Sequence, residues 1–390
     1  MRNILILLYA VTVAAHLPLA LVFRRGSAML GVPLPAAALV ACALLLALPF
    51  HWRLQLALRD RPISAARRLL VEEPYFVHWT ATLLALPLAV LAALGYALAW
   101  RPTLGRLLSW PTAEALYGAC YLAGLALAIW GVCVRRRRVR VVTVEVPVAG
   151  LGAAFDGYRI AQLSDLHVGS LCPPDWAQRW VRQVNELQVD AVALTGDYGS
   201  SGTRFHQAIA AALGELQAAD GVFAVMGNHD YYGDGEPLMT LVQDSGIRLL
   251  RNEHVTLERD GDRCCLAGID DRYTRRTDIE AALCGRALDQ PLLVLAHDPQ
   301  SFVELAERGA ALVLCGHTHW GQLAVPWLAR RFNYARLWQS YCAGSYRRGD
   351  SQLYVSPGLG TTGPPVRIGT WPEITVIRLR ASTPPAEPAR

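Results

Sequence analysis

Two histidines stand two residues apart where an apolar run of the sequence ends. The run covers residues 310–315, and Gly316-His317-Thr318-His319 follows it directly. An apolar run of this length is typical of a buried strand, and alternate residues of an extended segment point the same way. Both imidazole rings are therefore expected to face one centre, as two ligands of a metal ion would. A His-x-His pair alone is a weak signal, because histidine pairs are also common on protein surfaces.

Four other apolar runs end in residues of the same chemistry. Each has the length of a strand, and carboxylate, amide or imidazole side chains follow it at once. The segments that follow these runs are Asp165-Leu166-His167, Gly196-Asp197, Gly227-Asn228-His229-Asp230 and His297-Asp298. In α/β sheets, ligands bind at the carboxyl ends of the strands. The sequence therefore predicts that these polar groups converge in one crevice.

Helical segments separate these strands. Helices are predicted at residues 175–188, 205–218, 236–245, 278–286 and 299–307. Strands that alternate with helices indicate a layered α/β domain. Valines alternate with polar residues from Val139 to Pro147, as in a half-exposed strand, so this domain is expected to cover residues 139–380. Residues 381–390 contain three prolines and are predicted to be a disordered tail.

The apolar excess of the chain is concentrated before residue 135. Hydrophobic residues make up 53% of the sequence and the mean hydropathy is +0.24. A membrane-spanning helix takes about 20 apolar residues. Spans are predicted at about residues 4–23, 32–50, 76–100 and 113–134, within a transmembrane region of residues 1–138. A signal peptide is the alternative for the first segment, but three further spans follow it.

The arginines indicate an orientation for these spans. With the amino terminus in the cytoplasm, the inner segments hold eleven arginines and the outer loops four. The run Arg135–Arg138 directly follows the last span, which favours an anchor at anionic lipid over a nucleic-acid patch. Nine cysteines without framework spacing indicate a reducing compartment. We expect a multi-pass protein of a bacterial-type inner membrane whose catalytic domain faces the cytoplasm.

The five motifs, in this order, resemble the calcineurin-like metallophosphoesterase superfamily over about residues 157–379. The resemblance implies a four-layer α/β/β/α sandwich, here preceded by four transmembrane helices. It also implies two divalent metal ions. One would be bound by Asp165, His167 and His319, the other by Asn228, His297 and His317, and Asp197 would bridge them. This mixture of ligands suits Mn²⁺ best, with Fe or Zn²⁺ as alternatives, because Mg²⁺ takes few imidazoles.

The resemblance also implies a mechanism. Two cations would bind the phosphodiester oxygens, and a hydroxide that bridges them would attack without a covalent intermediate. His229 would donate a proton to the leaving oxygen rather than bind metal, and Asp230 would orient its ring. A turn with capping contacts is the alternative for both residues. The family usually has a second aspartate three positions after the bridging one, whereas Ser200 stands here, which leaves the support of the site open.

Several segments of the sequence bear on the substrate. Residues 227–232, 268–271 and 355–367 look like the membrane-associated bacterial phosphodiesterase branch, which is linked to hydrolysis of UDP-2,3-diacylglucosamine in lipid A synthesis. The Trp- and Arg-rich segment Trp320–Arg348 could be an interfacial lid for a lipid, a packed loop or a nucleic-acid face. The glycine-rich residues 358–363 lack P-loop spacing and are expected to form a turn that lines the site.

These observations predict a membrane-bound, dinuclear metal-dependent phosphoesterase. It would cleave a phosphodiester or pyrophosphate bond, in a lipid-linked substrate such as UDP-2,3-diacylglucosamine, with membrane lipids and no nucleic acid as partners. One alternative is a membrane-anchored phosphatase of broad specificity or cyclic-nucleotide phosphodiesterase. Another alternative is a non-catalytic membrane scaffold or sensor.

Overall fold

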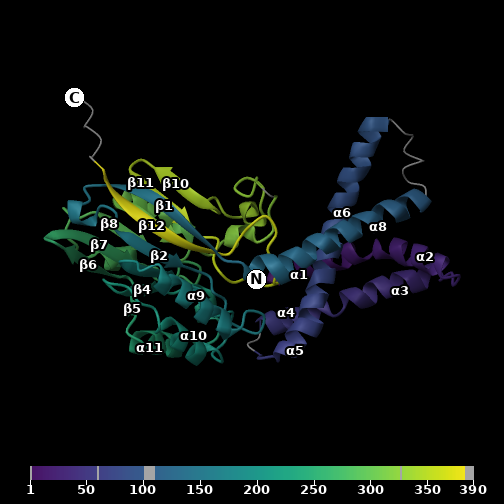
Figure 1. The fold of residues 1–390 in the computed structure, drawn as a ribbon, viewed down its shortest axis with the longest axis horizontal. Coiled ribbons are helices and arrows are strands. Elements are labelled where there is room, and N and C mark those ends of the chain that lie inside the picture. Colours follow the sequence, from purple (N-terminus) through teal and green to yellow (C-terminus); the bar gives the residue numbers. More distant parts are fainter. Residues whose placement is uncertain (1, 59–60, 101–109, 326, 383–390) are drawn as a thin grey trace. The chain divides into compact units, whose positions relative to one another are not determined.

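The computed structural model describes residues 2–58, 61–100, 110–325 and 327–382 (Figure 1). The chain divides into two compact units, which are described separately. The first consists of Met1–Leu56, Ile63–Arg135 and Pro364–Val366, and the second of Ala57–Pro62, Arg136–Gly363 and Arg367–Arg390. Residues 381 and 382 of the predicted tail belong to a strand, and residues 383–390 lie outside the described part of the chain.

The first unit is helical. Its helices are α1 (Arg2–His16), α2 (Leu19–Met29), α3 (Ala36–Ala47), α4 (Phe50–Leu58), α5 (Ala65–Arg67), α6 (Glu73–Trp100) and α8 (Trp110–Ile129). Wider turns at Arg68–Glu72 and Trp130–Val134 continue α5 into α6 and extend α8. Four stretches are long and apolar enough to cross a membrane, namely Ile6–Met29, Ala36–Leu56, Ala65–Gly95 and Thr112–Arg137. The prediction of four apolar helices is confirmed.

The third of these stretches begins at Ala65 rather than at residue 76. The structure pairs charges of the polar segment before residue 76 within this unit. Glu72 is buried, with its carboxylate 2.9 Å from Arg67 Nε and 3.3 Å from Arg53 Nε. Because the charges are compensated within the unit, the helix continues through this polar segment.

The second unit contains two six-stranded sheets. The first has the order β1-β12-β2-β3-β4-β5, and the second has the order β10-β11-β9-β8-β7-β6. The strands of the first sheet are β1 (Arg140–Ala149), β2 (Arg159–Leu163), β3 (Ala191–Thr195), β4 (Val222–Val225), β5 (Arg248–Leu249) and β12 (Glu373–Ser382). Those of the second are β6 (Glu253–Arg259), β7 (Asp262–Gly268), β8 (Leu292–Leu295), β9 (Ala310–Cys315), β10 (Gly344–Arg348) and β11 (Ser351–Val355). Strands β2 to β5 run parallel, as do β7, β8, β9 and β11.

Three apolar clusters hold the layers of this unit together. One cluster lies between the sheets and includes Ile160 of β2, Leu293 of β8 and Leu312 of β9. A second joins the first sheet to helices α9 (Pro174–Glu186), α10 (His206–Leu213) and α11 (Glu236–Asp244). A third joins the second sheet to α12 (Ile279–Leu283) and α13 (Phe302–Glu307). The predicted four-layer α/β/β/α sandwich is therefore confirmed.

The five sequence motifs lie directly after the carboxyl ends of parallel strands. Strands β2, β3 and β4 of the first sheet and β8 and β9 of the second end two or three residues before the motif side chains. All five strands are buried along most of their length. The packing of the two sheets therefore brings polar groups from distant parts of the sequence to one edge of the sandwich.

Candidate metal centre

The main chain turns sharply at the predicted ligands. Asp165, His167, Asp197, His317 and His319 have φ values of 53°, 46°, 57°, 69° and 50°. Residues other than glycine rarely adopt the left-handed region, and they do so mostly at functional sites. The expectation that His317 and His319 lie on an extended segment and face one centre is wrong. Strand β9 ends at Cys315, and the turn that follows sends the two rings to different neighbours.

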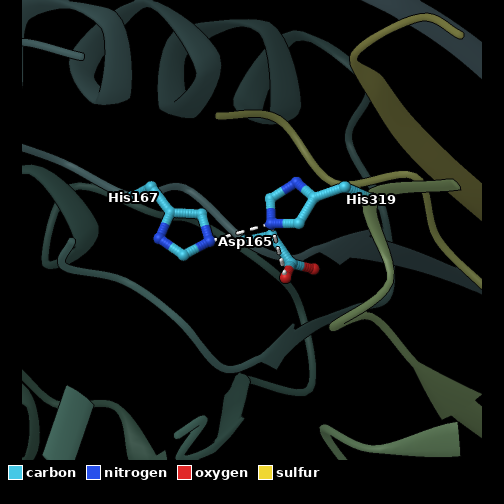
Figure 2. A group of neighbouring side chains, drawn as sticks. All are labelled: Asp165, His167 and His319. Carbon is cyan, nitrogen blue, oxygen red and sulfur yellow. Dashed lines mark hydrogen bonds and ion pairs between the residues drawn. The ribbon is translucent and has the colours of Figure 1, made fainter. Parts of the chain in front are cut away.

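Asp165, His167 and His319 form a first group of buried side chains (Figure 2). One potential ligand atom from each lies within 4.8 Å of the others. His319 Nε2 is 2.9 Å from His167 Nε2 and 3.4 Å from Asp165 Oδ1. Two imidazole nitrogens and a carboxylate oxygen that face one point suit a divalent transition metal.

Asp197, His297 and His317 form a second group whose ligand atoms also lie within 4.8 Å of one another. His297 Nε2 is 3.2 Å from Asp197 Oδ2 and 3.2 Å from His317 Nδ1. His297 Nδ1 donates to the carbonyl of Thr195 at 2.8 Å. Since a carbonyl only accepts, this bond places the ring proton on Nδ1 and leaves Nε2 to face the group.

Asp197 lies between the two groups. Its Oδ2 is 3.2 Å from His297 Nε2 and 3.5 Å from His167 Nε2, while its Oδ1 accepts the main-chain N–H of His229 at 2.8 Å. Asn228 Nδ2 donates to the Tyr232 hydroxyl at 2.9 Å, but within the described chain no donor reaches its buried Oδ1. A buried unpaired oxygen is costly, and a cation would satisfy it. The residues present therefore fit a pair of divalent metal ions.

The protonation states suit metal binding. Burial, followed by the repulsion of neighbouring cationic rings, lowers the pKa of His167 to about 3 and lowers the pKa of His317 and His319 below the usual range. Burial opposes ionisation of Asp197, but the charge of His297 outweighs it and holds the pKa of this carboxyl well below its usual value. Neutral imidazoles and an ionised carboxylate are the forms that bind a metal. Burial favours the neutral ring of His297, but the charge of Asp197 outweighs it and raises the pKa of His297 well above its usual value, so this ring would lose a proton on binding a metal.

His229 lies at the edge of the first group. It lines a small pocket with His167, Ser200 and the loop of residues 361–363. Its Nδ1 donates to the carbonyl of Ser200 at 2.6 Å, so its Nε2 is the nitrogen left to exchange a proton in the pocket. Because the acceptor is a main-chain carbonyl, this contact does not depend on the serine side chain at position 200. His229 also forms a third group of potential ligand atoms with His167 and Asp197.

Asp230 does not orient the ring of His229, so this prediction is wrong. Its carboxylate instead accepts four main-chain N–H groups, from Asp197, Tyr198, Gly199 and Gly227, at 2.8, 2.8, 3.2 and 2.9 Å. Burial and then the Asp197 charge raise the pKa of Asp230 to about 7, and the main-chain donors oppose this rise. The carboxylate faces the main chain because the two loops after β3 and β4 leave these donors without other partners. Asp230 thus braces the loops that carry Asp197 and Asn228.

We expect Asp230→Ala to destabilise the second unit. The substitution leaves four buried N–H groups unpaired, and each such group costs roughly 1–3 kcal/mol unless water reaches it. With partial relaxation, the unfolding temperature should fall by about 10 °C. Tryptophan fluorescence of the detergent-solubilised protein during heating would measure the shift. Asp244→Ala, at an exposed aspartate in α11, is the matched control. An unfolding temperature like that of the control would contradict the bracing role.

Arg367 is a site residue that the sequence analysis did not assign. It is fully buried, and its Nη2 donates to the carbonyls of Pro357 and Gly360 at 2.8 and 2.6 Å and lies 3.4 Å from His319 Nδ1. The glycine-rich loop packs tightly here, since a Cβ at Gly360 would lie 2.1 Å from the Leu166 carbonyl oxygen. The expectation of a turn that lines the site is confirmed. An arginine just after a glycine-rich turn was the signal that could have identified Arg367.

Comparisons with known proteins agree with this site. The sequence profile of the calcineurin-like phosphoesterase family matches residues 158–321. A transmembrane protein with metallophosphoesterase domain from Danio rerio is 37% identical over 268 residues, which are 65% of this chain and 60% of that protein. The uncharacterized metallophosphoesterase YkuE of Bacillus subtilis is 32% identical over 235 residues, which are 58% of this chain and 81% of that protein. The chain therefore belongs to the calcineurin-like phosphoesterase family, a family of metal-dependent phosphoester hydrolases.

A second vertebrate relative has the same name as the Danio rerio protein. The transmembrane protein with metallophosphoesterase domain of Bos taurus is 35% identical over 259 residues, which are 62% of this chain. The matches span 60% and 57% of the lengths of the Danio rerio and Bos taurus proteins. The chain therefore spans less than two thirds of the length of these two relatives.

Proposed function

We propose that this chain hydrolyses phosphoester bonds with two divalent metal ions. The observation that carries the proposal is the position of Asp197, whose one carboxylate oxygen lies within 3.5 Å of imidazole nitrogens from both groups. The proposed ligands are Asp165, His167 and His319 for one ion, Asn228, His297 and His317 for the other, and Asp197 for both. When bound, two such cations supply Lewis acidity to phosphate oxygens and lower the pKa of water.

The side chains of the site have separate tasks in this proposal. The imidazole rings and the ionised Asp197 would hold the ions, and the rings of His167, His317 and His319 would not first have to lose a proton. His229 Nε2 faces the pocket and delivers a proton to the leaving oxygen, while the Ser200 carbonyl holds the ring in place. Asp230 keeps the loops after β3 and β4 in register, and Arg367 fixes the loop behind His319.

Metal removal tests the proposal directly. Full-length protein in detergent is expected to hydrolyse bis-p-nitrophenyl phosphate, to lose this activity on treatment with a chelator, and to regain it with Mn²⁺. Fe²⁺ and Zn²⁺ are tested in parallel, because the ligand set also suits them. Metal analysis should find two ions per chain. Activity that is indifferent to chelation would contradict the mechanism, and a stable protein that binds no metal would favour the scaffold.

We further propose that the natural substrate is a lipid-linked phosphodiester or pyrophosphate, such as UDP-2,3-diacylglucosamine. The support is that one chain carries the candidate metal centre and four stretches long and apolar enough to cross a membrane. Turnover of UDP-2,3-diacylglucosamine in mixed micelles is expected to have a higher kcat/KM than turnover of a soluble UDP-sugar. Turnover of soluble diesters alone would instead favour a broad or cyclic-nucleotide phosphodiesterase.

We infer from the arginine distribution that the second unit faces the cytoplasm of a bacterial-type inner membrane. Cys284 reports on this orientation, because it is the exposed thiol of the described chain. A membrane-impermeant maleimide should label Cys284 in inside-out vesicles and not in intact spheroplasts. Labelling in intact spheroplasts that is lost in the Cys284→Ser variant would show the opposite orientation.

A further inference from the structure

The loop of residues 327–338, called here the aromatic loop, leaves its large apolar side chains in solvent. Trp327 is 99% exposed, Leu337 72% and Phe332 58%. The others are Trp338, Leu328 and Tyr334, which are 50%, 48% and 42% exposed. Single exposed apolar residues are ordinary, but several within one short loop mark a binding surface for a protein, a ligand or a membrane.

The base of this loop is ordered. Asn333 is buried, its Oδ1 accepts the main-chain N–H of Arg336 at 3.0 Å, and its Nδ2 donates to the Ala329 carbonyl at 2.6 Å. Ala335 is buried in a small cluster with Cys342 and Ala343. The exposed rings of Tyr334 and Trp338 pack edge to face with centroids 4.6 Å apart. The loop therefore presents its apolar side chains from a fixed base.

The aromatic loop is attached to the candidate metal centre. The Thr318 hydroxyl, between the two histidines, donates to the Cys342 carbonyl at 2.9 Å. A Cβ at Gly321 would lie 2.7 Å from Tyr334 N and 2.8 Å from Ala335 N, so the turn after His319 packs directly on the base of the loop. The position of the aromatic loop therefore also determines the packing around His319.

The charge of the loop is positive and uncompensated by acidic residues nearby in the sequence. The loop contains Arg330, Arg331 and Arg336, and no aspartate or glutamate occurs from residue 308 to residue 349. Arg330 and Arg336 donate to the carbonyls of Ser345 and Ser340, which do not neutralise their charge. Exposed arginines among tryptophan, tyrosine and leucine are suited to the headgroup region of a membrane with anionic lipid.

We propose that the aromatic loop inserts into the headgroup region of a bilayer that contains anionic lipid. The loop supplies apolar side chains for the acyl boundary and arginines for the phosphate groups, as interfacial segments do. Exposed leucines at 328 and 337 suit acyl chains, whereas a nucleic-acid face would use rings that stack on bases. A bilayer is the proposed partner because the same chain carries four stretches able to cross a membrane. This binding does not depend on hydrolysis.

Depth-dependent quenching tests the insertion in the full-length protein. A fluorescent amino acid replaces Trp327, and in a control protein it replaces Leu288, which is 82% exposed and lies outside the loop. Both proteins are reconstituted into phosphatidylcholine vesicles with or without phosphatidylglycerol. The quencher is a lipid spin-labelled near its headgroup. We expect quenching at position 327, stronger with phosphatidylglycerol, and none at position 288. In the variant Arg331→Glu with Arg336→Glu, quenching at 327 should weaken.

Several outcomes would overturn the proposal. A probe at 327 with the emission of water and no quenching would show that the loop stays in solvent. A blue-shifted, unquenched probe that is the same in detergent would show that protein covers the loop. Equal quenching at 288 would show that the contact is not specific, and quenching unchanged by the arginine substitutions would remove the role of charge. Hydrolysis of bis-p-nitrophenyl phosphate, measured on the same samples, reports separately on the proposed enzyme.

Discussion

Replacing Asp197 by asparagine is expected to reduce hydrolysis of bis-p-nitrophenyl phosphate on the order of 10³-fold. The substitution keeps the shape of the side chain, and its oxygen can still accept the N–H of His229, which now lies 2.8 Å from Asp197 Oδ1. It removes the negative charge that both groups share and places an amide beside the nitrogens of His167 and His297. Losing one preorganised oxyanion-hole donor costs about 10²–10³ in rate, and losing a ligand to two ions should cost at least as much.

Metal content separates this effect from simple unfolding. Asp197→Asn should retain fewer than two ions per chain while its unfolding temperature stays near that of the parent. Asp270→Asn is the matched control, because Asp270 is also buried but contacts Arg251 and Tyr231 rather than the two groups. The control should keep two ions and most of the hydrolysis. Full activity in Asp197→Asn would show that the shared carboxylate is not needed and would remove the main support for the proposed mechanism.

The strands that carry the site could be predicted because each is a short, continuous apolar run. Strand β9 covers the predicted run of residues 310–315, and β2, β3, β4 and β8 each end one or two residues before the polar segment that was predicted to follow a strand. Buried parallel strands have no polar face, so this signal is strong in sequence. The polar residues after each run were therefore correctly predicted to follow the carboxyl ends of strands.

The orientations of the side chains could not be predicted in the same way. The positive φ values at His317 and His319 reverse the expected alternation, and they depend on packing against loops far away in the sequence. Asp230 illustrates the same limit, since its four N–H partners come from two different loops. The spacing of residues in the sequence describes neighbours along one strand or helix, whereas these contacts join loops that follow different strands.

Replacing His229 by glutamine is expected to slow hydrolysis by about 10²–10⁴-fold for a diester with a strongly basic leaving group. The ring is held by the Ser200 carbonyl at Nδ1, so only Nε2 is left to deliver a proton in the pocket. Glutamine can donate a hydrogen bond but cannot transfer a proton at neutral pH. An alkyl leaving group needs that proton, whereas p-nitrophenolate leaves without it. The loss should therefore be much smaller with bis-p-nitrophenyl phosphate than with a dialkyl phosphodiester, from which an alkoxide has to depart.

The alternative role for His229 is that of a metal ligand, because its ring also forms a group with His167 and Asp197. The two roles differ in what glutamine does to the metal. A proton donor can be lost with two ions still bound, whereas loss of a ligand lowers the metal content and slows both substrates equally. His254→Gln is the control and should behave like the parent, because the ring of His254 also donates to a main-chain carbonyl, that of Ala282 at 2.9 Å, but belongs to none of the groups of potential ligand atoms. Two retained ions with a rate loss that grows with leaving-group basicity would establish His229 as the acid, and equal losses with one ion missing would assign it to the metal instead.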